Sequence, residues 1–298
     1  MENNDRLILV DAYSQIYRSF HAIPRLTNSH GDPTNCIYGV ASFLLRIEET
    51  LPHKFGAVAF DKGAPAERLE LLPEYKATRP PMPDDMQQQL DGVQAWIEAA
   101  GWPILQAEGH EADDLIAAVV KQTQKETYII SSDKDLAQLV TENVRLMMPG
   151  TKGRLNEVGA KEVEDKWGIP PNAICDFLAL VGDSSDNIDG VPGVGAKTAA
   201  DLLQQFGSID NAFRHLDQIN GKKLSKKLAE HRELVRRNQQ VIKLNPTLPD
   251  DCCDDLSSLE RNTPDWEKLK KFSEYYNFKS LSKRLDKLKE NSQNPSLL

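Results

Sequence analysis

Apolar positions in the first half of the chain fall in short runs that alternate with helical patterns. This alternation is typical of an α/β domain with a mainly parallel sheet flanked by helices. The runs predict strands at residues 7–10, 57–60, 104–106, 128–130 and 144–147. The stretches with helical periodicity between them predict helices at residues 38–49, 85–100 and 112–123.

From about residue 170 onward the periodicity is helical throughout, with helices predicted at 172–181, 196–205, 210–216, 224–244 and 266–289. We therefore expect an α/β core of residues 1–168, a helical region of residues 169–290 and a frayed tail of residues 291–298. One proline-rich stretch inside the core, at about residues 62–86, keeps no period. A segment of this length without periodicity is typical of a functional loop, and we call it the lid.

Acidic residues follow four of the predicted strands. The carboxyl ends of parallel strands border the crevice where such sheets hold ligands, so these acids should converge. Each also has an ordinary structural explanation, such as a favourable place in the first turn of a helix or an N-cap. A further pair follows an apolar helix, where a solvated loop is the alternative. The candidate set is Asp11, Asp61, Glu111, Asp113, Asp114, Asp133, Asp135, Asp183 and Asp186.

Carboxylates that share one site repel one another. Two charges ~4 Å apart in water cost about 1 kcal/mol, and several times more near protein. Either some of these acids are protonated or cations neutralise them. Oxygen ligands without histidine or cysteine favour Mg²⁺ or Mn²⁺ over zinc. Two such ions can hydrolyse a phosphodiester, one activating water and the other supporting the leaving oxygen.

Six segments in this order carry a family resemblance: VDAYSQIYRSFHA, VAFD, EYKATRPPMPDDM, EGHEADDLIA, SSDKDLAQL and GDSSDNIDGVPGVGAKTA. Together they resemble the 5′-nuclease superfamily, in particular the 5′–3′ exonuclease domain of bacterial DNA polymerase I and the flap endonucleases. The resemblance spans roughly residues 6–290. It implies a PIN-like nuclease core followed by a helical DNA-binding part of the helix–hairpin–helix type.

The resemblance also implies roles for individual residues. Asp11, Asp61, Glu111 and Asp113 would serve one metal site, and Asp113 is a candidate bridge to a second site. That second site would use Asp114, Asp133, Asp135, Asp183 and Asp186. The lid would form a helical arch over the metals. There Lys76 and Arg79 would act catalytically on the scissile phosphate, and Tyr75 would stack on a base.

A glycine hairpin at residues 190–199 is the predicted grip on duplex DNA. Its lysine stands one residue out of register for a P-loop, and the segment follows a loop instead of a strand. Glycines at a helix N-terminus let backbone N–H groups approach one phosphate. In the family this element often holds a monovalent cation such as K⁺. The hairpin residues expected to bind DNA are Gly193, Gly195, Lys197 and Thr198.

Two further groups of basic residues are candidates for phosphate contacts. The stretch 221–237 follows the hairpin directly, so it is either a solvated face or a track for DNA; its candidates are Lys222, Lys223, Lys226 and Lys227. Arg18, on the helix expected after Asp11, would contact phosphate or form a salt bridge.

Overall charge does not argue against DNA, although the formal net charge is −9. Setting the nine candidate metal ligands aside leaves 36 acidic and 36 basic residues, so basic surfaces can form. No apolar run is long enough to span a membrane or to act as a signal peptide, which predicts a cytoplasmic protein. The four cysteines form no CxxC pair and are expected to be reduced thiols.

The sequence thus predicts a metal-dependent 5′–3′ exonuclease or 5′-flap endonuclease. We expect a stand-alone, monomeric enzyme without a polymerase domain. Its substrate would be DNA with a 5′ flap, a 5′ end or a nick, and a separate DNA polymerase is a candidate partner. Two alternatives stay open: a non-catalytic DNA-structure-binding protein of the same fold, and a related ribonuclease. The complete acid set disfavours the first, because a pure binder would gain affinity by shedding negative charge.

Overall fold

A six-stranded sheet forms the centre of the computed structural model, which describes residues 5–150, 154–249, 252 and 256–293. The strand order is β3-β2-β1-β4-β5-β6, and all neighbours are parallel except β5 and β6. The predicted mainly parallel α/β core is confirmed. The strands are β1 (Leu7–Asp11), β2 (Phe55–Ala59), β3 (Ile104–Leu105), β4 (Thr127–Ile130), β5 (Val144–Pro149) and β6 (Leu155–Val158).

Both faces of the sheet are buried, because successive side chains of a strand point to opposite faces. Along β1, Leu7 and Leu9 pack into one apolar cluster and Ile8 and Val10 into another. Helices α6 (Ala112–Gln122), α7 (Ala160–Trp167) and α8 (Ile174–Val181) contribute to the first cluster. Helices α1 (Ala12–Ala22), α2 (Asn35–Thr50) and α5 (Leu90–Ala99) contribute to the second.

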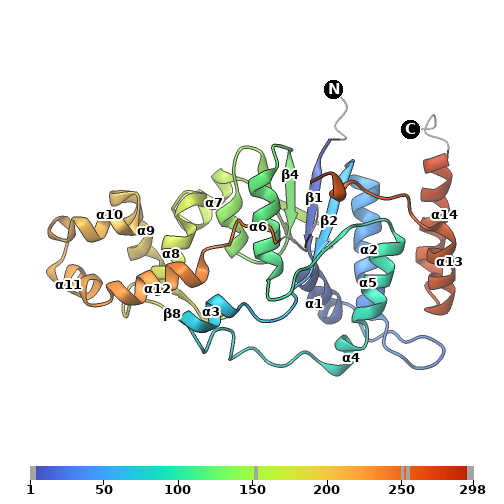
Figure 1. Ribbon diagram of the computed structural model, residues 1–298, viewed down its shortest axis with the longest axis horizontal. Coiled ribbons are helices and arrows are strands. Elements are labelled where there is room, and N and C mark those ends of the chain that lie inside the picture. The colour runs from blue at the N-terminus through green and yellow to red at the C-terminus, as the bar shows by residue number, and fades with distance from the viewer. Residues whose placement is uncertain (1–4, 151–153, 250–251, 253–255, 294–298) are drawn as a thin grey trace.

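The predicted helical second half is also confirmed, but its helices lie at two ends of the molecule. Figure 1 shows α9 (Ala196–Phe206), α10 (Ile209–Arg214), α11 (Lys222–Glu230) and α12 (Arg232–Ile242) at one end. Helices α13 (Trp266–Tyr275) and α14 (Lys279–Gln293) lie at the other, where they pack against α5 and α2. Residues 169–290 therefore do not form one bundle in space.

Several predicted helices are interrupted. The stretch 224–244 is two helices that meet at His231, and α13 and α14 are separated by Asn277, whose φ of +57° ends the first helix. The stretch 85–100 begins as α4 (Asp84–Gln87) and resumes as α5. Short 3₁₀ helices stand at Asp135–Leu139, Pro171–Ala173, Leu216–Gln218 and Leu256–Leu259.

The lid contains a short helix that the sequence pattern did not predict, α3 (Ala66–Leu71). The expected arch helix at residues 75–79 is absent, since this stretch consists of successive turns. A two-stranded ribbon, β7 (Gly182–Asp183) and β8 (Ile188–Asp189), was also missed, as were β6 and α7.

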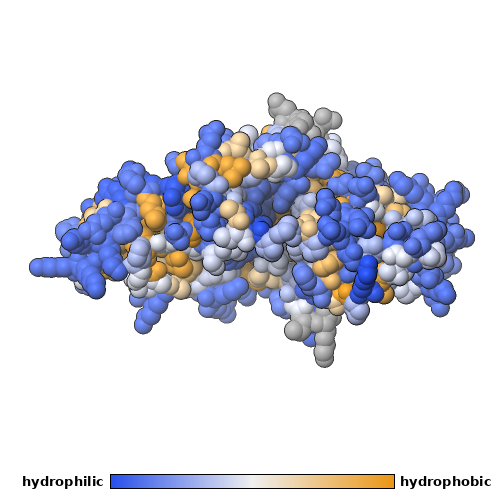
Figure 2. Space-filling model, turned by 90° about the horizontal axis from the view of Figure 1, so that it is seen from below, coloured by the Kyte–Doolittle hydropathy of each residue, from blue (hydrophilic) through white to orange (hydrophobic). Residues whose placement is uncertain are grey.

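The surface agrees with a protein whose apolar residues are mostly inside. Figure 2 shows hydrophilic residues over most of one face, with small apolar patches between them. In the described part of the chain, no helix combines the length and apolar character needed to cross a membrane. Cys36 and Cys175 are free thiols, while Cys253 and most of the predicted tail lie outside the described residues.

Candidate active site

The first group of predicted acids stands where β1, β2 and α6 meet. Asp11 ends β1 and is only 8% exposed; its carboxylate accepts the Ser14 N–H at 3.0 Å and the Ser131 hydroxyl at 2.6 Å. Asp61 follows β2 and accepts the Ala112 N–H at the start of α6, at 2.7 Å. These bonds fix the strand-end carboxylates against the first turn of α6.

The first turn of α6 supplies Glu111 and Asp113 to the same place. Glu111 is the N-cap residue and is buried. Burial, followed by the charges of Asp133 and Asp11, raises the pKa of Asp113 well above its usual value. Burial also raises the pKa of Asp11 to about 6, although its bond from Ser131 opposes this shift. The carboxylates therefore repel one another and share a site poor in water.

The second group lies directly beside the first. Carboxylate oxygens of Asp135, Asp183 and Asp186 all lie within 4.8 Å of one another, and all three side chains are buried. The Oδ1 atom of Asp135 is buried and has no hydrogen-bond partner. Burial and the charge of Asp133 raise the pKa of Asp135 to about 8. A buried oxygen without a donor among three converging carboxylates fits a divalent cation, for which such oxygens are the preferred ligands.

One predicted ligand, Asp114, is directed elsewhere. Its two carboxylate oxygens accept from the Arg68 guanidinium, each at 2.7 Å, and Oδ1 also accepts the Asn245 N–H at 2.8 Å. Asp114 is buried by these contacts. The remaining eight acids converge, and we call them the acid cluster: Asp11, Asp61, Glu111, Asp113, Asp133, Asp135, Asp183 and Asp186.

The lid places its cations on the acid cluster. The Lys76 ammonium is paired with Glu111, and Arg79 donates to Asp186 at 2.6 Å. The backbone of Lys76 has a φ of +56°, unusual for a residue with a side chain, and its N–H donates to the Asp186 carbonyl at 3.0 Å. The side chain of Asn187 donates to the Glu74 carbonyl at 2.9 Å. Turns tied to the β7–β8 loop thus bring both cations to the acids without the expected helix.

Tyr75 occupies a different position from the predicted one. It is 8% exposed, and its hydroxyl donates to Glu111 at 3.1 Å and to Asp186 at 3.3 Å. The Lys76 ammonium lies over its ring, 4.9 Å from the centroid. The expected stacking of a base on Tyr75 is not available in this conformation, since both the ring and the hydroxyl are already engaged.

Two residues near the acids were not predicted as site residues. Lys134 Nζ donates to Asp183 at 2.6 Å. Burial pushes the pKa of Asp183 upward, but the bonds from Lys134 and Ser185 outweigh it, and the pKa is lowered. Lys134 stands between two predicted ligands, Asp133 and Asp135, and that position could have pointed to it. Arg68 is the second residue, and nothing in its neighbourhood in the sequence marks it.

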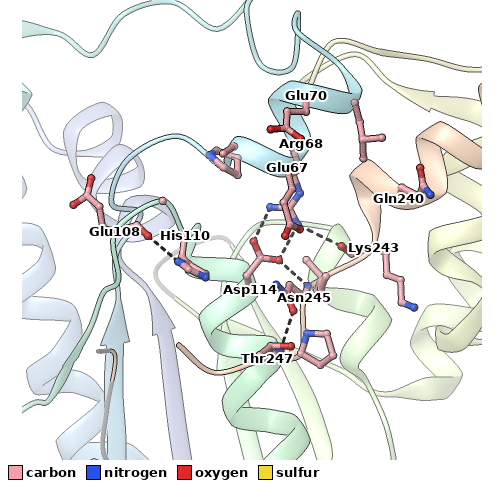
Figure 3. Close-up of a pocket in the computed structure, with 16 residues that line it drawn as sticks. Glu67, Arg68, Glu70, Glu108, His110, Asp114, Gln240, Lys243, Asn245 and Thr247 are labelled. Carbon is pink, nitrogen blue, oxygen red and sulfur yellow. Dashed lines mark hydrogen bonds and ion pairs between the residues drawn. The ribbon is translucent and has the colours of Figure 1, made fainter. Parts of the chain in front are cut away.

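Arg68 lies between the acid cluster and a large neighbouring cavity. That cavity has a volume of about 930 Å³, and Figure 3 shows Arg68 on α3 pointing toward Asp114 in its wall. Glu67, Glu70 and Glu108 also line it. This acidic lining does not suit a nucleic-acid strand, so size alone does not identify the active site.

The glycine hairpin lies between β8 and α9. Gly193 has a φ of +76°, and Gly195, at the N-cap of α9, has an ordinary φ of −96° and no atom within 4 Å of an added Cβ. Gly193, Gly195 and Lys197 are exposed, and Thr198 is half-buried. The N-terminus of α9 is therefore open to a phosphate.

Helix α11 presents its predicted lysines beside this hairpin. Lys222, Lys223 and Lys226 are exposed, and Lys226 lies 3.6 Å from Glu230. Lys227 is half-buried and donates to the Pro192 carbonyl at 2.7 Å, which ties α11 to the hairpin.

Arg18 is half-buried on α1 and donates to the Gly150 carbonyl at 3.0 Å, and it forms no salt bridge with any acid that the structure describes. It lines a cavity of about 300 Å³ together with Arg46, Arg154 and Arg284, and no acidic residue stands among the described residues of the lining. Such a lining suits an anionic ligand.

A mainly parallel sheet that collects carboxylates over its strand ends, beneath a lid that carries cations, defines a nuclease core. The chain belongs to the 5′-3′ exonuclease family: the model for the N-terminal resolvase-like domain matches residues 6–168, and the model for the C-terminal SAM fold matches residues 169–267. The predicted family is confirmed, and the chain is an enzyme of the 5′–3′ exonuclease class.

Individual relatives agree with this assignment. The chain is 35% identical to a 5′-3′ exonuclease of Aquifex aeolicus over 98% of its own length and 99% of the relative. It is 38% identical to a thermostable DNA polymerase I of Thermus filiformis, covering 93% of this chain and 32% of that protein. The chain thus spans about a third of the length of this polymerase relative. A T5 5′-exonuclease with bound divalent metal ions (zinc) is structurally similar, with a TM-score of 0.67 and 25% identity over 90% of this chain and 97% of that one.

Proposed function

We propose that this chain is a divalent-metal-dependent nuclease that removes nucleotides from 5′ ends of DNA and cuts 5′ flaps. The observation that carries this proposal is the convergence of Asp135, Asp183 and Asp186, together with a buried Asp135 oxygen that has no partner among the described residues. The structurally similar T5 exonuclease binds divalent metal ions, which supports a divalent site here as well. Carboxylate oxygens alone favour Mg²⁺ or Mn²⁺.

The acid cluster has two parts that would each hold an ion. Asp11, Asp61, Glu111 and Asp113 would hold one, and Asp133, Asp135, Asp183 and Asp186 would hold the other, with Asp113 as a candidate bridge. Bound ions would supply an activated water and charge stabilisation at the phosphate. We assign Asp114 a different role, because it lines the neighbouring cavity, where Arg68 and the Asn245 N–H hold its carboxylate.

Lys76 and Arg79 would act on the scissile phosphate. In the structure they pair with Glu111 and Asp186, so both ammonium and guanidinium groups already stand over the acids. Once those carboxylates are neutralised, both cations are available to a phosphate placed above them. Negative charge that develops on the phosphate oxygens during cleavage is then stabilised by groups positioned in advance. Tyr75 would stack on a base only after leaving Glu111 and Asp186.

Duplex DNA would be held at a distance from the acids. The exposed hairpin at Gly193 and Gly195 and the nearby Lys197, Thr198, Lys222, Lys223 and Lys226 would contact phosphates, and Lys227 would hold the hairpin from α11. A K⁺ ion at the hairpin is part of this proposal. Arg18, in a cavity with three other arginines, would contact a further phosphate. We further propose a monomer that cooperates with a separate DNA polymerase.

Incubation of a labelled 5′-flap DNA with the protein in Mg²⁺, and separately in EDTA, tests the proposed function. We expect cleavage near the flap junction in Mg²⁺ and none in EDTA. Binding without cleavage in both buffers would identify a DNA-structure-binding protein. An RNA strand of the same geometry, included as a competitor, would be cut in preference if the enzyme were a ribonuclease.

A further inference from the structure

The guanidinium of Arg68 connects three segments of the chain that meet at the acid cluster. Arg68 is 7% exposed and comes from α3, at the base of the lid. Toward α6 it binds both Glu111 and Asp114. Toward α12 its Nε donates to the Val241 carbonyl at 2.8 Å, and Nη2 lies 3.4 Å from the Lys243 carbonyl. Figure 3 shows Arg68 facing Asp114 and the Lys243 carbonyl in the wall of the cavity.

The C-terminal end of α12 is seated on the nuclease core by these contacts. The carbonyl between the two that Arg68 contacts, that of Ile242, accepts from Gln138 at 3.2 Å. The next turn of chain is also held, because the Asn245 N–H donates to Asp114. Three successive carbonyls at the negative end of a helix thus receive donors from the core, one of them a cation.

The same helix reaches the DNA-binding hairpin. One turn before Val241, Asn238 is fully buried, and its side-chain amide donates to the Asp189 carbonyl at 2.8 Å. Asp189 ends β8, immediately before the hairpin glycines. A second bond runs from Asn238 to the Ala179 carbonyl of α8 at 3.1 Å. A hydrogen bond therefore joins Asp189, just before the hairpin, to Asn238 on α12. Val241, three residues further along α12, is bound by Arg68, which also binds Glu111.

We propose that Arg68 is a positioning residue. It couples the packing of α12 on the nuclease core, and with it the binding of duplex DNA at the hairpin, to the orientation of the metal-site carboxylate Glu111. This inference rests on the proposed metal and duplex sites. Duplex DNA bound at the hairpin stabilises the packing of α12 on the nuclease core, and α12 in turn fixes Arg68. Arg68 then keeps Glu111 in the orientation that a divalent ion needs. Metal binding and duplex binding consequently strengthen each other.

Replacing Arg68 by lysine separates positioning from simple charge. Arg68→Lys keeps the positive charge but loses the fork that contacts Glu111, Asp114 and Val241 at once. If Arg68 contributes only its positive charge, Arg68→Lys leaves the Mg²⁺ affinity unchanged. If Arg68 orients the ligand Glu111, the loss of its contacts weakens Mg²⁺ affinity by roughly 10–100-fold. The matched control is Arg261→Lys, because Arg261 also binds a glutamate and two backbone carbonyls but lies far from the acids in the fold.

The experiment measures Mg²⁺ binding by calorimetry, with and without a covalently closed dumbbell duplex. The dumbbell has no 5′ end to cut, and a titration of the dumbbell alone corrects for Mg²⁺ bound to DNA. For the unaltered protein we expect the dumbbell to tighten Mg²⁺ binding by at least about fivefold, and Mg²⁺ to tighten dumbbell binding by the same factor. We expect Arg68→Lys to lose this mutual effect and Arg261→Lys to keep it.

A second variant tests the proposal even if the Arg68→Lys protein does not fold. Gln138→Ala removes the donor to Ile242 from a half-buried side chain without touching Arg68 or any acid. We expect it to bind Mg²⁺ normally in the absence of DNA and to show a reduced effect of the dumbbell. An undiminished effect in both Arg68→Lys and Gln138→Ala, or none in the unaltered protein, overturns the proposal. An unaltered protein that binds no Mg²⁺ at all would instead overturn the proposed function.

Discussion

The backbone N–H of Asp135 donates to the Asp133 carboxylate at 2.8 Å, so these two acids are held together by the turn that follows β4. This bond is one that a purely structural acid would make. The adjacent Asp135 Oδ1, buried and without a donor, is not explained by the turn. The same segment therefore forms a stable turn and leaves one buried oxygen unpaired on a carboxylate that lies beside Asp183 and Asp186.

The first prediction concerns the charge of Asp135. Asp135→Asn should lower the single-turnover cleavage rate in Mg²⁺ by at least about 100-fold. Loss of a residue that binds the metal directly should reduce the rate more than loss of a residue that only orients a ligand. In EDTA above about pH 8, where the Asp135 carboxyl is ionised, the same variant should be more stable, because one repelling charge is gone. For charges ~4 Å apart this effect is on the order of 1–4 kcal/mol, or a rise of several degrees in Tm.

Thermal unfolding in EDTA and a cleavage assay in Mg²⁺ check both parts. Asp286→Asn is the control, because it removes one charge from an exposed position on α14, away from the acids. Full activity of Asp135→Asn in Mg²⁺ would remove this residue from the metal site.

The second prediction concerns pH in the metal-free protein. The pKa is raised from 3.8 to about 6 for Asp11 and to about 8 for Asp135, chiefly by burial. Between the unfolded and folded values the folded protein binds more protons than the unfolded chain, so its stability falls as pH rises. In EDTA the free energy of unfolding should therefore decrease from about pH 4 to about pH 8.

Urea unfolding at several pH values, with EDTA or with Mg²⁺, measures this dependence. Mg²⁺ binds only the deprotonated carboxylates, so its stabilising effect should grow as pH rises. A metal-free protein that becomes more stable between pH 5 and pH 8 would contradict the electrostatic account of the acid cluster.

The sequence alone predicted the five parallel strands and the acids near their ends, for a simple geometric reason. Strand ends of a parallel sheet share one edge, so acids after those strands must lie near one another. The pairing of Asp114 with Arg68 joins positions 46 apart in the sequence, and the bond from Arg68 to Val241 joins positions 173 apart. Such contacts depend on how α3 and α12 pack, which no local pattern encodes. The turns that bury Tyr75 escaped prediction for the same reason.

The third prediction concerns the hairpin. Gly195→Ala should reduce affinity for duplex DNA by about 10-fold, or roughly 1.4 kcal/mol, because a methyl group would stand between a phosphate and the N-terminus of α9. Gly195 is a better test than Gly193, whose φ of +76° would strain any larger residue. An added Cβ at Gly195 meets no atom within 4 Å, so the free protein should accept it.

Fluorescence anisotropy with a labelled duplex measures this affinity. Gly159→Ala is the control, since Gly159 is also an N-cap glycine, on α7, with a similar φ of −95°. Cleavage by Gly195→Ala at saturating protein should stay near normal. Unchanged duplex affinity in a folded Gly195→Ala protein would exclude the hairpin from the DNA interface.

The last prediction distinguishes a catalytic Lys76 from a lysine that only attracts DNA. Lys76 is held over the acid cluster by its pairing with Glu111 and by the bond from its N–H to the Asp186 carbonyl. Burial would lower its pKa, but the charges of Glu111 and Asp186 outweigh burial and raise it, so Lys76 stays charged at neutral pH. A cation fixed over the phosphate helps most when negative charge develops there, and such contacts can contribute on the order of 10²-fold in rate. A lysine that only attracts DNA would change affinity modestly, in a manner that depends on salt.

We therefore expect Lys76→Ala to lower the single-turnover rate by about 100-fold at saturating enzyme while changing the dissociation constant by less than about fivefold. At a φ of +56° the backbone free energy is equally unfavourable for alanine and lysine, so the turn should persist in Lys76→Ala. Both quantities should be measured at two salt concentrations, with Lys226→Ala as a control from the exposed face of α11. The control should weaken binding more at low salt and leave the saturated rate unchanged. If Lys76→Ala behaves like Lys226→Ala, its ammonium serves to attract DNA, and stabilisation of the transition state must be assigned to Arg79 and to the ions that the acids would hold.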